Sequence, residues 1–376
     1  MPIPVPLDEY PVHQVPLFHS EVGSTDRNFY DRCIMHAYDR EGGVQIATGL
    51  GVYPNLGVID AYVVVRKDGR QHVVRTSGAL GPDRMKQEVG PYRIEVLEPL
   101  SSVRVVCDAP EQGISVDLTF TSPFAPLPEP RHVQRSDFKP LLDASRFVQI
   151  GDWTGTVTVA GEEIAVTPRT WSGSRDRSWG IRPSGEAPPA GRPARTEGFW
   201  WNWIPLHLGD QALMVIAQES AQGHRFLTEA IRIFPIESGK APEQLGWPEF
   251  DVRYASGTRL PDGAAIHLTD RKRNALTLHL ENHGYIALNV GAGYGGDPHW
   301  QHGQWKGEEY LDGAVYEQKD PEVAKRIPFS VIDHVATARL TGPDGAVLAE
   351  GVGIFEHGTF GRHDPSGFTG WDSVAP

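Results

Sequence analysis

The chain consists largely of short segments in which apolar and polar residues alternate, separated by turns rich in glycine. Residues 58–66 are typical of one strand, 67–70 of a turn that carries Asp-Gly, and 71–75 of the returning strand. The same pattern of strand, turn and strand recurs over 153–166 and 336–350. The 41 glycines and 31 prolines are dispersed along the chain and interrupt long helices. These features predict an all-β fold.

Three further segments, 92–97, 103–107 and 114–120, alternate as a meander with one buried face. Helical signals are short and local, and we expect helical turns only at 81–88 and 321–326. Strands that follow one another at roughly ten-residue spacing favour a sandwich or a barrel over β-α-β units. No glycine-rich phosphate loop follows a strand and begins a helix, which disfavours the nucleotide-binding folds.

The length of 376 residues exceeds what one ordinary core supports and predicts two domains. The best linker candidate is 183–195, which is rich in proline, glycine and alanine and lacks an apolar period. We therefore expect one β-domain over 1–186 and a second over 187–376. A cleft between two domains is a common place for a small ligand.

Charge and cysteine content limit the partners and the compartment. The net charge is −13 and the basic residues are scattered, so nucleic acid is not an expected partner. Cys33 and Cys107 form no metal or redox motif; they fit a reduced cytoplasm, although one disulfide stays open. The N-terminus has neither the basic nor the apolar region of a secretory signal. No apolar run approaches the roughly twenty residues of a membrane-spanning helix. We expect a cytoplasmic monomer or homodimer, with transient contact to a membrane surface allowed.

Five of the ten tryptophans lie between positions 171 and 203, around an aspartate held between two arginines, Asp176 between Arg175 and Arg177. Aromatic rings around a charged group are the usual composition of a small-molecule site. A guanidinium directed at Asp176 would favour its carboxylate, whereas burial beside Trp171 and Trp179 would favour the acid. Both outcomes stay open, as does a surface network of arginine and aspartate.

The segment 199–207 predicts a strand whose two faces differ. Alternation places Trp201 and Trp203 on one face, and Trp200 and Asn202 on the other. One of the two faces belongs to the core. The other face is expected to line a cavity, with Asn202 as a polar group in its wall.

A second group of candidates lies in 294–307, after Tyr294. The spacing of His299 and His302 resembles that of a metal site, but no third ligand follows at a defined distance, and we predict no metal. Glycine and proline on both sides favour a turn. We expect His302 between Trp300 and Trp305 at a barrel mouth, as a base or hydrogen-bond partner near neutral pH.

The C-terminal segment 355–363 predicts a closing strand. It carries Glu356, His357 and His363, whose neighbours alternate between opposite faces and which we expect to be exposed polar residues. The sequence has no Gly-x-Ser-x-Gly elbow, and neither cysteine has a catalytic surrounding. It therefore gives no support to nucleophilic hydrolysis.

The residues Gly173 to Gly180, Gly-Ser-Arg-Asp-Arg-Ser-Trp-Gly, resemble the Gly-x-x-Asp-His-x-Trp-Gly signature of the carotenoid 1,2-hydratase (hydroxyneurosporene synthase) and AttH-like family. The preceding hairpin at 155–161 and the tryptophan-rich strand after the motif match the same pattern. The resemblance implies two tandem lipocalin-like, calycin-related domains. Family members include hydratases that need no cofactor and fungal cyclases of the Diels-Alder type.

The resemblance also implies roles for single residues. Asp176 corresponds to the family's acid, and Trp179 and Gly180 form the scaffold that presents it. The family's histidine is Arg177 here, so the pair that would shuttle a proton is not intact at this position. Arg177 could instead bind an anionic substrate or hold Asp176 ionised.

Together these features predict an acid-base enzyme, without cofactor or metal, for an isoprenoid, steroid-like or polyketide substrate. Asp176 would protonate a carbon-carbon double bond, and hydration, isomerisation or cyclisation would follow. The alternatives are a carrier of an apolar molecule without chemistry and an enzyme that uses a metal held by His302. The expected catalytic residues are Asp176, Arg177 and His302, and the expected substrate-binding residues are Trp171, Trp179, Trp201, Asn202, Trp203, Tyr294, Trp300 and Trp305.

Overall fold

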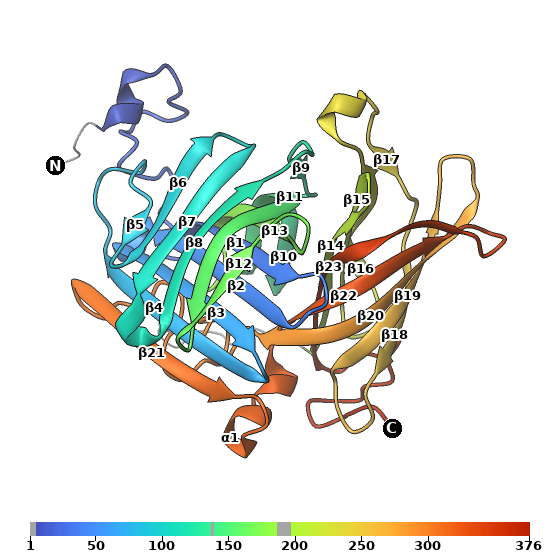
Figure 1. Ribbon diagram of the computed structural model, residues 1–376. Coiled ribbons are helices and arrows are strands. Elements are labelled where there is room, and N and C mark those ends of the chain that lie inside the picture. The colour runs from blue at the N-terminus through green and yellow to red at the C-terminus, as the bar shows by residue number, and fades with distance from the viewer. Residues whose placement is uncertain (1–4, 137–138, 186–196) are drawn as a thin grey trace.

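The computed structural model describes residues 5–136, 139–185 and 197–376. Within them the chain is almost entirely β, in two curled antiparallel half-barrel sheets that lie side by side (Figure 1). This confirms the prediction of two tandem lipocalin-like units. Most of the linker predicted at 183–195 lies outside the described residues. None of the helices in the described residues is long and apolar enough to cross a membrane.

The first sheet has fourteen strands, and its main path runs β21-β4-β3-β2-β1-β13-β11-β8-β7-β6-β5, with β9, β10 and β12 also paired to β11. The strands are β1 (Phe29–Asp39), β2 (Val44–Tyr53), β3 (Val58–Lys67), β4 (Arg70–Ala79), β5 (Glu88–Val89), β6 (Tyr92–Glu98), β7 (Ser102–Ala109), β8 (Ile114–Thr121), β9 (Leu127–Pro128), β10 (His132–Ser136), β11 (Lys139–Val159), β12 (Glu162–Val166), β13 (Trp171–Ile181) and β21 (Glu309–Glu317).

The second sheet has nine strands in the order β17-β16-β15-β14-β23-β22-β20-β19-β18. The strands are β14 (Gly198–Leu208), β15 (Gln211–Glu219), β16 (Arg225–Ile233), β17 (Glu243–Gln244), β18 (Glu249–Tyr254), β19 (Pro261–Thr269), β20 (Ala275–Ala287), β22 (Ile332–Thr341) and β23 (Val347–Gly361). The helical turns are α1 (Pro321–Ala324), η1 (Pro6–Glu9), η2 (Pro54–Leu56), η3 (Pro110–Gln112), η4 (Ile236–Ser238) and η5 (Ile327–Phe329).

The local predictions are confirmed with one exception. The three hairpins form as β3-β4, β11-β12 and β22-β23, and the meander forms as β6-β7-β8. The helical turn expected near 321 is α1, where the Asp320 side chain accepts a hydrogen bond from the Glu322 amide. The helix expected over 81–88 is wrong. Its one large apolar residue, Met85, is exposed, and the segment forms turns that lead into β5.

Strand β21 lies in the second half of the chain but pairs antiparallel with β4 at the edge of the first sheet. It covers an edge that would otherwise expose unpaired backbone groups. The division of the chain at residue 186 stays a prediction, and β21 places part of the second half of the sequence on the first sheet.

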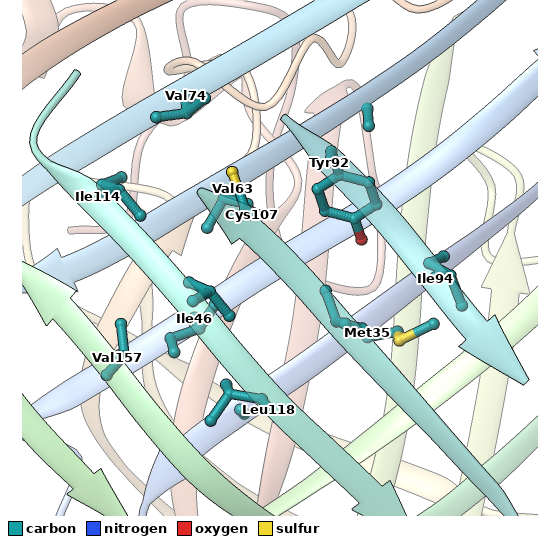
Figure 2. Packing of buried hydrophobic residues seen from close by; sticks show 14 of the residues in the cluster. Met35, Ile46, Val63, Val74, Tyr92, Ile94, Cys107, Ile114, Leu118 and Val157 are labelled. Atoms are coloured by element: carbon teal, nitrogen blue, oxygen red, sulfur yellow. The ribbon is translucent and has the colours of Figure 1, made fainter. Parts of the chain in front are cut away.

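The core of the first unit lies between β1–β4 and the facing strands β6–β8 and β11. Figure 2 shows Met35, Ile46 and Val63 from the first layer opposite Cys107 and Leu118 from the second. Cys33 and Cys107 are both buried and free, so the disulfide that the sequence left open does not form. A separate cluster joins the two sheets through side chains of both, among them Val148, Ile150, Trp203, Met214 and Ile354.

The strands around Asp176 pack closely because of glycine. A Cβ atom at Gly173 of β13 would collide with the His36 carbonyl oxygen and the Trp153 indole, so only glycine fits there. At Gly180 the backbone has φ of 140°, in the region that favours glycine, and lies against the Asp143 carbonyl oxygen. These two positions fix β13 tightly between β1 and β11.

Candidate functional site

The first candidate site is a cavity of about 160 Å³ between the two sheets. Its wall combines strands of the first sheet with β14 and β23 of the second. We call it the inter-sheet cavity; the residues that define it here are Arg32, Arg146, Asp176, Trp201, Tyr294 and Glu356.

Strand register places Asp176 in this cavity. Asp176 of β13 lies opposite Ile34 of β1 and Val148 of β11, and two positions further along Ser178 lies opposite Arg32 and Arg146. Because side chains alternate along a strand, both arginines lie on the face of Asp176. Arg146 Nε is 3.4 Å from Asp176 Oδ2. Burial raises the pKa of Asp176 above its usual value, and Arg146 and Arg32 oppose this only in part.

The two arginines beside Asp176 in the sequence do not contact it. Arg175 Nε donates to Gln149 Oε1 at 2.9 Å, and Arg177 Nη2 lies 3.1 Å from Asp31 Oδ1. Alternation along β13 explains this, because odd and even positions face opposite sides of the sheet. The cations that act on Asp176 come from neighbouring strands instead.

Those cations are held by aromatic rings. The Arg32 guanidinium lies 4.9 Å from the centre of the Tyr294 ring, and that of Arg182 lies 5.7 Å from it. Arg146 lies 5.6 Å from the centre of the Trp201 ring. Contacts of this kind keep a buried guanidinium positioned and partly compensate its lost hydration. The wall of the cavity is therefore cationic as well as aromatic.

A second acid, Glu356 of β23, lines the same cavity. Burial and the adjacent Asp333 carboxyl raise its pKa to about 8. Burial raises the pKa of Asp333 to about 7. Asp333 Oδ2 is 2.8 Å from His36 Nε2, and burial lowers the pKa of His36 to about 4. Because two buried carboxyls in contact cannot both carry charge, this group holds protons at neutral pH.

Both tryptophans on this face of β14 donate their indole N–H to a carboxyl. Trp201 donates to Glu356, and Trp203 donates to Glu129 at 2.8 Å. Glu129 also lies 3.2 Å from Arg146 Nη1, and burial raises its pKa to about 7. The rings therefore position the acids as well as forming apolar wall.

Two groups in the described residues could hold a metal ion. His36, Asp333 and Glu356 have ligand atoms within 4.8 Å of one another, and so do Asp8, His13 and His19. His299 and His302, the pair singled out by its spacing, belong to neither group. The first group opens to the inter-sheet cavity through Glu356.

The structure brings four of the predicted site residues together. Asp176, Trp201, Trp203 and Tyr294 all line the inter-sheet cavity. His302 lies behind Tyr294 with ring centres 4.9 Å apart, and burial lowers its pKa to about 4. It is therefore a neutral imidazole at pH 7 rather than a group that titrates there.

The other predicted residues lie elsewhere. Trp171 belongs to the core of the first unit, Trp300 is buried beside His302, and Asn202 faces away from the cavity, where its side chain contacts His357 at 2.8 Å. Trp179 and Trp305 are 40% and 49% exposed and do not line the cavity, and neither does Arg177. Their functional roles stay predictions.

The expectation of exposed polar residues in the C-terminal segment is wrong. His357 and His363 are 1% exposed, and Glu356 is among the groups that burial affects most. Alternation does separate Glu356 from His357, but both faces of β23 are covered here. Side chains that would face water on a simple sheet therefore lie in protein on either side.

Sequence reasoning missed Arg32, Arg146, Arg182, His36 and Asp333. Arg182 lies just after the motif, whereas the other four stand outside it, and strand register brings them to the cavity or to the carboxyl group beside it. The available signal was a charged residue inside an otherwise apolar strand, as Asp333 is in 331–338. Such a residue must be paired, neutralised or functional.

Comparison with known proteins places this geometry in context. The sequence model of a protein family, described as "Family of unknown function (DUF8625)", matches residues 5–369. No curated protein matches the chain in sequence. An AttH candidate (NE1406) from Nitrosomonas europaea aligns with a TM-score of 0.52 at 14% identity, over 93% of this chain and 98% of that one.

Two further solved structures align over most of the chain. CghA with Sch210972 aligns with a TM-score of 0.52 at 12% identity, over 88% of each chain. Kievitone hydratase from Nectria haematococca aligns with a TM-score of 0.48 at 13% identity, over 92% of this chain and 94% of that one. The AttH and CghA alignments show that the fold is that of AttH-like proteins.

Proposed function

Since the chain belongs to DUF8625, a family of unknown function, we propose its activity from its own inter-sheet cavity: acid-base catalysis, without an organic cofactor, on a carbon-carbon double bond of a hydrophobic molecule. One observation carries the proposal. Two carboxyl groups, Asp176 and Glu356, line one aromatic cavity, and the pKa of each is raised. A protonated carboxyl in such a wall is a proton donor for an alkene or an enol.

The two acids have different surroundings, which suggests different roles. Asp176 faces Arg146 at 3.4 Å, so the carboxylate left after proton donation would be stabilised at once. Glu356 has Asp333 as its neighbour and would keep its proton. Acid-base catalysis commonly uses two titratable groups whose environments give them different pKa values. We therefore assign proton donation to Asp176.

The reaction then proceeds as follows. The Asp176 proton forms a new C–H bond, and the double bond's other carbon becomes cationic beside the faces of Trp201 and Trp203. Water that adds to this carbon returns a proton to the Asp176 carboxylate, which completes a hydration. Loss of a neighbouring proton to the Asp176 carboxylate gives an isomer instead. Attack by a second double bond of the same molecule closes a ring and leaves a new cationic carbon, which loses a proton to the Asp176 carboxylate.

The cations of the wall indicate what else the substrate carries. Arg32 and Arg182, held over Tyr294, suit a carbonyl, enolate or carboxylate oxygen next to the reacting carbons. At about 160 Å³ the cavity holds only the reacting part of an isoprenoid, steroid-like or polyketide molecule, and the rest would extend outward. CghA, which shares the fold, is described with the small molecule Sch210972.

The test is turnover by the Asp176→Asn variant. Purified protein is incubated with unsaturated terpenoids, steroids and polyketides in D₂O, and mass spectrometry detects a product that gains one water or is an isomer, with solvent deuterium bound to carbon. We expect the variant to lose roughly 100- to 10,000-fold in rate. Ligand binding and melting temperature should stay nearly unchanged.

The matched control is Asp143→Asn, an acid on β11 that pairs with Arg131 outside the cavity. It should leave turnover intact. Activity retained in Asp176→Asn would refute the assignment of the acid. Tight ligand binding without any product in the unmodified protein would instead favour a carrier, the alternative that an apolar aromatic wall also suits.

A further inference from the structure

A second cavity lies on the other face of β14. Its volume is about 690 Å³, and Trp200, Glu219, Trp247, Phe250, Tyr254 and His363 are among its walls. We call it the second-sheet cavity. Because Trp200 and Trp201 alternate along β14, one faces this cavity and the other faces the inter-sheet cavity. The two cavities are therefore distinct sites on one strand.

Three side chains form a continuous chain of hydrogen bonds at this cavity. Ser366 Oγ is 2.8 Å from His363 Nδ1, and His363 Nε2 is 3.1 Å from Glu219 Oε2. The other carboxylate oxygen of Glu219 accepts from Arg225 Nε at 2.9 Å and from Arg225 Nη2 at 2.6 Å. This is the order of contacts between a nucleophile, a base and the carboxylate that orients the base.

The fold brings these residues together from two places, the end of β15 and the turn after β23. Glu219 is the last residue of β15, and His363 follows β23, which is separated from β15 in the sheet only by β14. His363 and Phe368 exchange backbone hydrogen bonds, so the chain between them is a tight turn that returns Ser366 to the histidine. Glu219 and His363 are 6% and 1% exposed, whereas Ser366 is half-buried and borders the cavity.

We propose that Ser366, His363 and Glu219 form a nucleophilic site that cleaves an ester or a similarly activated acyl compound. The substrate would carry an aromatic or apolar substituent. This site goes beyond the proposed function, because it uses another cavity and another reaction. Sequence motifs do not predict this site, since Ser366 lies outside any Gly-x-Ser-x-Gly elbow. Such groups are recognised by geometry and roles rather than by order in the chain.

In the reaction, Ser366 Oγ attacks the acyl carbon as its proton passes to His363 Nδ1. The C–O bond to the alcohol then breaks, and the departing oxygen takes that proton from His363. Water, deprotonated by His363, attacks the acyl-serine; the carboxylic acid leaves, and Ser366 regains its proton. No oxidant, reductant or further reactant is needed, and one water is consumed for each ester cleaved.

The neighbours of this group fit these roles. Burial acts against the Glu219 carboxylate, but hydrogen bonds from His363 and Arg225 outweigh it and lower its pKa below the usual value, so the group is ionised. The Tyr254 hydroxyl, whose pKa burial raises, stays protonated between Ser366 Oγ at 3.3 Å and His357 Nε2 at 3.1 Å. By turning its O–H away from His357 it can donate to the developing oxyanion. Trp200 stacks on His363 with ring centres 5.3 Å apart and helps to fix the plane of the imidazole.

The experiment uses a phosphorofluoridate, diisopropyl fluorophosphate, and a p-nitrophenyl ester of an aromatic acid. We expect Ser366 Oγ to bond to the phosphorus with loss of fluoride, as peptide mass mapping will show. Ser366→Ala and His363→Gln should abolish this labelling and lower ester hydrolysis at least 100-fold. Ser220→Ala is the matched control and should retain both, because this serine, next to Glu219, contacts the Gln222 side chain and the His224 backbone amide rather than an imidazole.

Glu219 is a positioning residue, and its test is the pH dependence. Glu219→Gln should move the midpoint of the labelling rate to lower pH, because the carboxylate no longer favours the protonated imidazole; a purely structural role would change only the amount of folded protein. A turn without chemistry would give no labelling at Ser366, or equal labelling in His363→Gln, and either result overturns the proposal. Asp176→Asn should label normally, so this test and that of the proposed function fail independently.

Discussion

The cavities on the two faces of β14 each contain a glutamate near a tryptophan and a histidine, and the two glutamates are in opposite protonation states. On one face Glu356 accepts from Trp201 and lies beside Asp333, and burial raises its pKa to about 8. On the other face Glu219 also lies near a tryptophan and a histidine, yet its pKa is lowered. Burial acts to raise the pKa of both carboxyls, so the opposite outcomes come from their neighbours.

The difference lies in the cation. Glu219 receives two hydrogen bonds from Arg225, whereas no hydrogen bond or ion pair to a guanidinium is found for Glu356 among the described residues. A buried carboxylate persists only where a charge or several donors compensate for lost hydration. The inter-sheet cavity is therefore suited to proton donation, and the second-sheet cavity to holding a base in place.

Removing the Arg225 cation should raise the pKa of Glu219, as burial does for Glu356. In Arg225→Met we expect a loss of about 3 kcal/mol in the free energy of unfolding at pH 8, because a buried carboxylate is left without its partner. The defect should shrink at pH 5, since Glu219 can then take up a proton in the folded state. Chemical denaturation at the two pH values measures both effects.

The control for this prediction is Arg253→Met on β18. Arg253 lies 3.6 Å from Asp262 in an exposed pair, so its loss should cost less than about 0.5 kcal/mol at either pH. Equal losses in Arg225→Met at pH 5 and pH 8 would contradict the view that Arg225 keeps Glu219 ionised.

Glu356 should make the folded protein less stable as pH rises. Its pKa is about 8 in the folded protein against 4.5 for an ordinary glutamate, so between these values the folded state holds a proton that the unfolded chain has released. Stability must therefore fall with rising pH across this window. Glu356→Gln removes the part of the fall that Glu356 causes, while the other buried carboxyls with raised pKa values keep theirs. The variant should be roughly 2 kcal/mol more stable than the unmodified protein at pH 8 but close to it at pH 5.

The measurement is again denaturation as a function of pH, with Glu350→Gln as the comparison. Glu350 lies on the same strand but is exposed, so this variant should follow the unmodified protein throughout. A Glu356→Gln variant that loses stability at pH 8 would show that the carboxylate, rather than the acid, is the native form.

The all-β fold was predictable because its signals are local. The turn at 67–70 and the alternation on either side of it specify a hairpin without reference to the rest of the chain. The position of β21 was not predictable in this way. It pairs with β4 over a long separation, 247 positions between Arg70 and Glu317, and no turn links the two. Such a pairing depends on the complete fold.

The same distinction between local signals and long-range pairing applies to the candidate site. Alternation within 199–207 correctly placed Trp201 and Trp203 together, and the motif singled out Asp176. It also drew attention to Arg175 and Arg177, although strand periodicity turns both away from Asp176. Arg32 and Arg146 were out of reach because their role depends on register across three strands, which sequence adjacency does not encode.

The smallest expected effect separates the two faces of β14 at neighbouring positions. Trp201→Phe keeps a ring but removes the N–H that favours the Glu356 carboxylate, so the pH-dependent fall in stability should move to higher pH by less than one unit, with a cost of about 1 kcal/mol. Trp200→Phe removes an indole from the other face and should leave that fall in place. The two substitutions are chemically identical and adjacent in sequence. A shift of the pH-dependent fall in both variants would mean that β14 transmits the change from one face to the other. A shift confined to Trp201→Phe would show that each carboxyl responds only to the residues on its own face of β14.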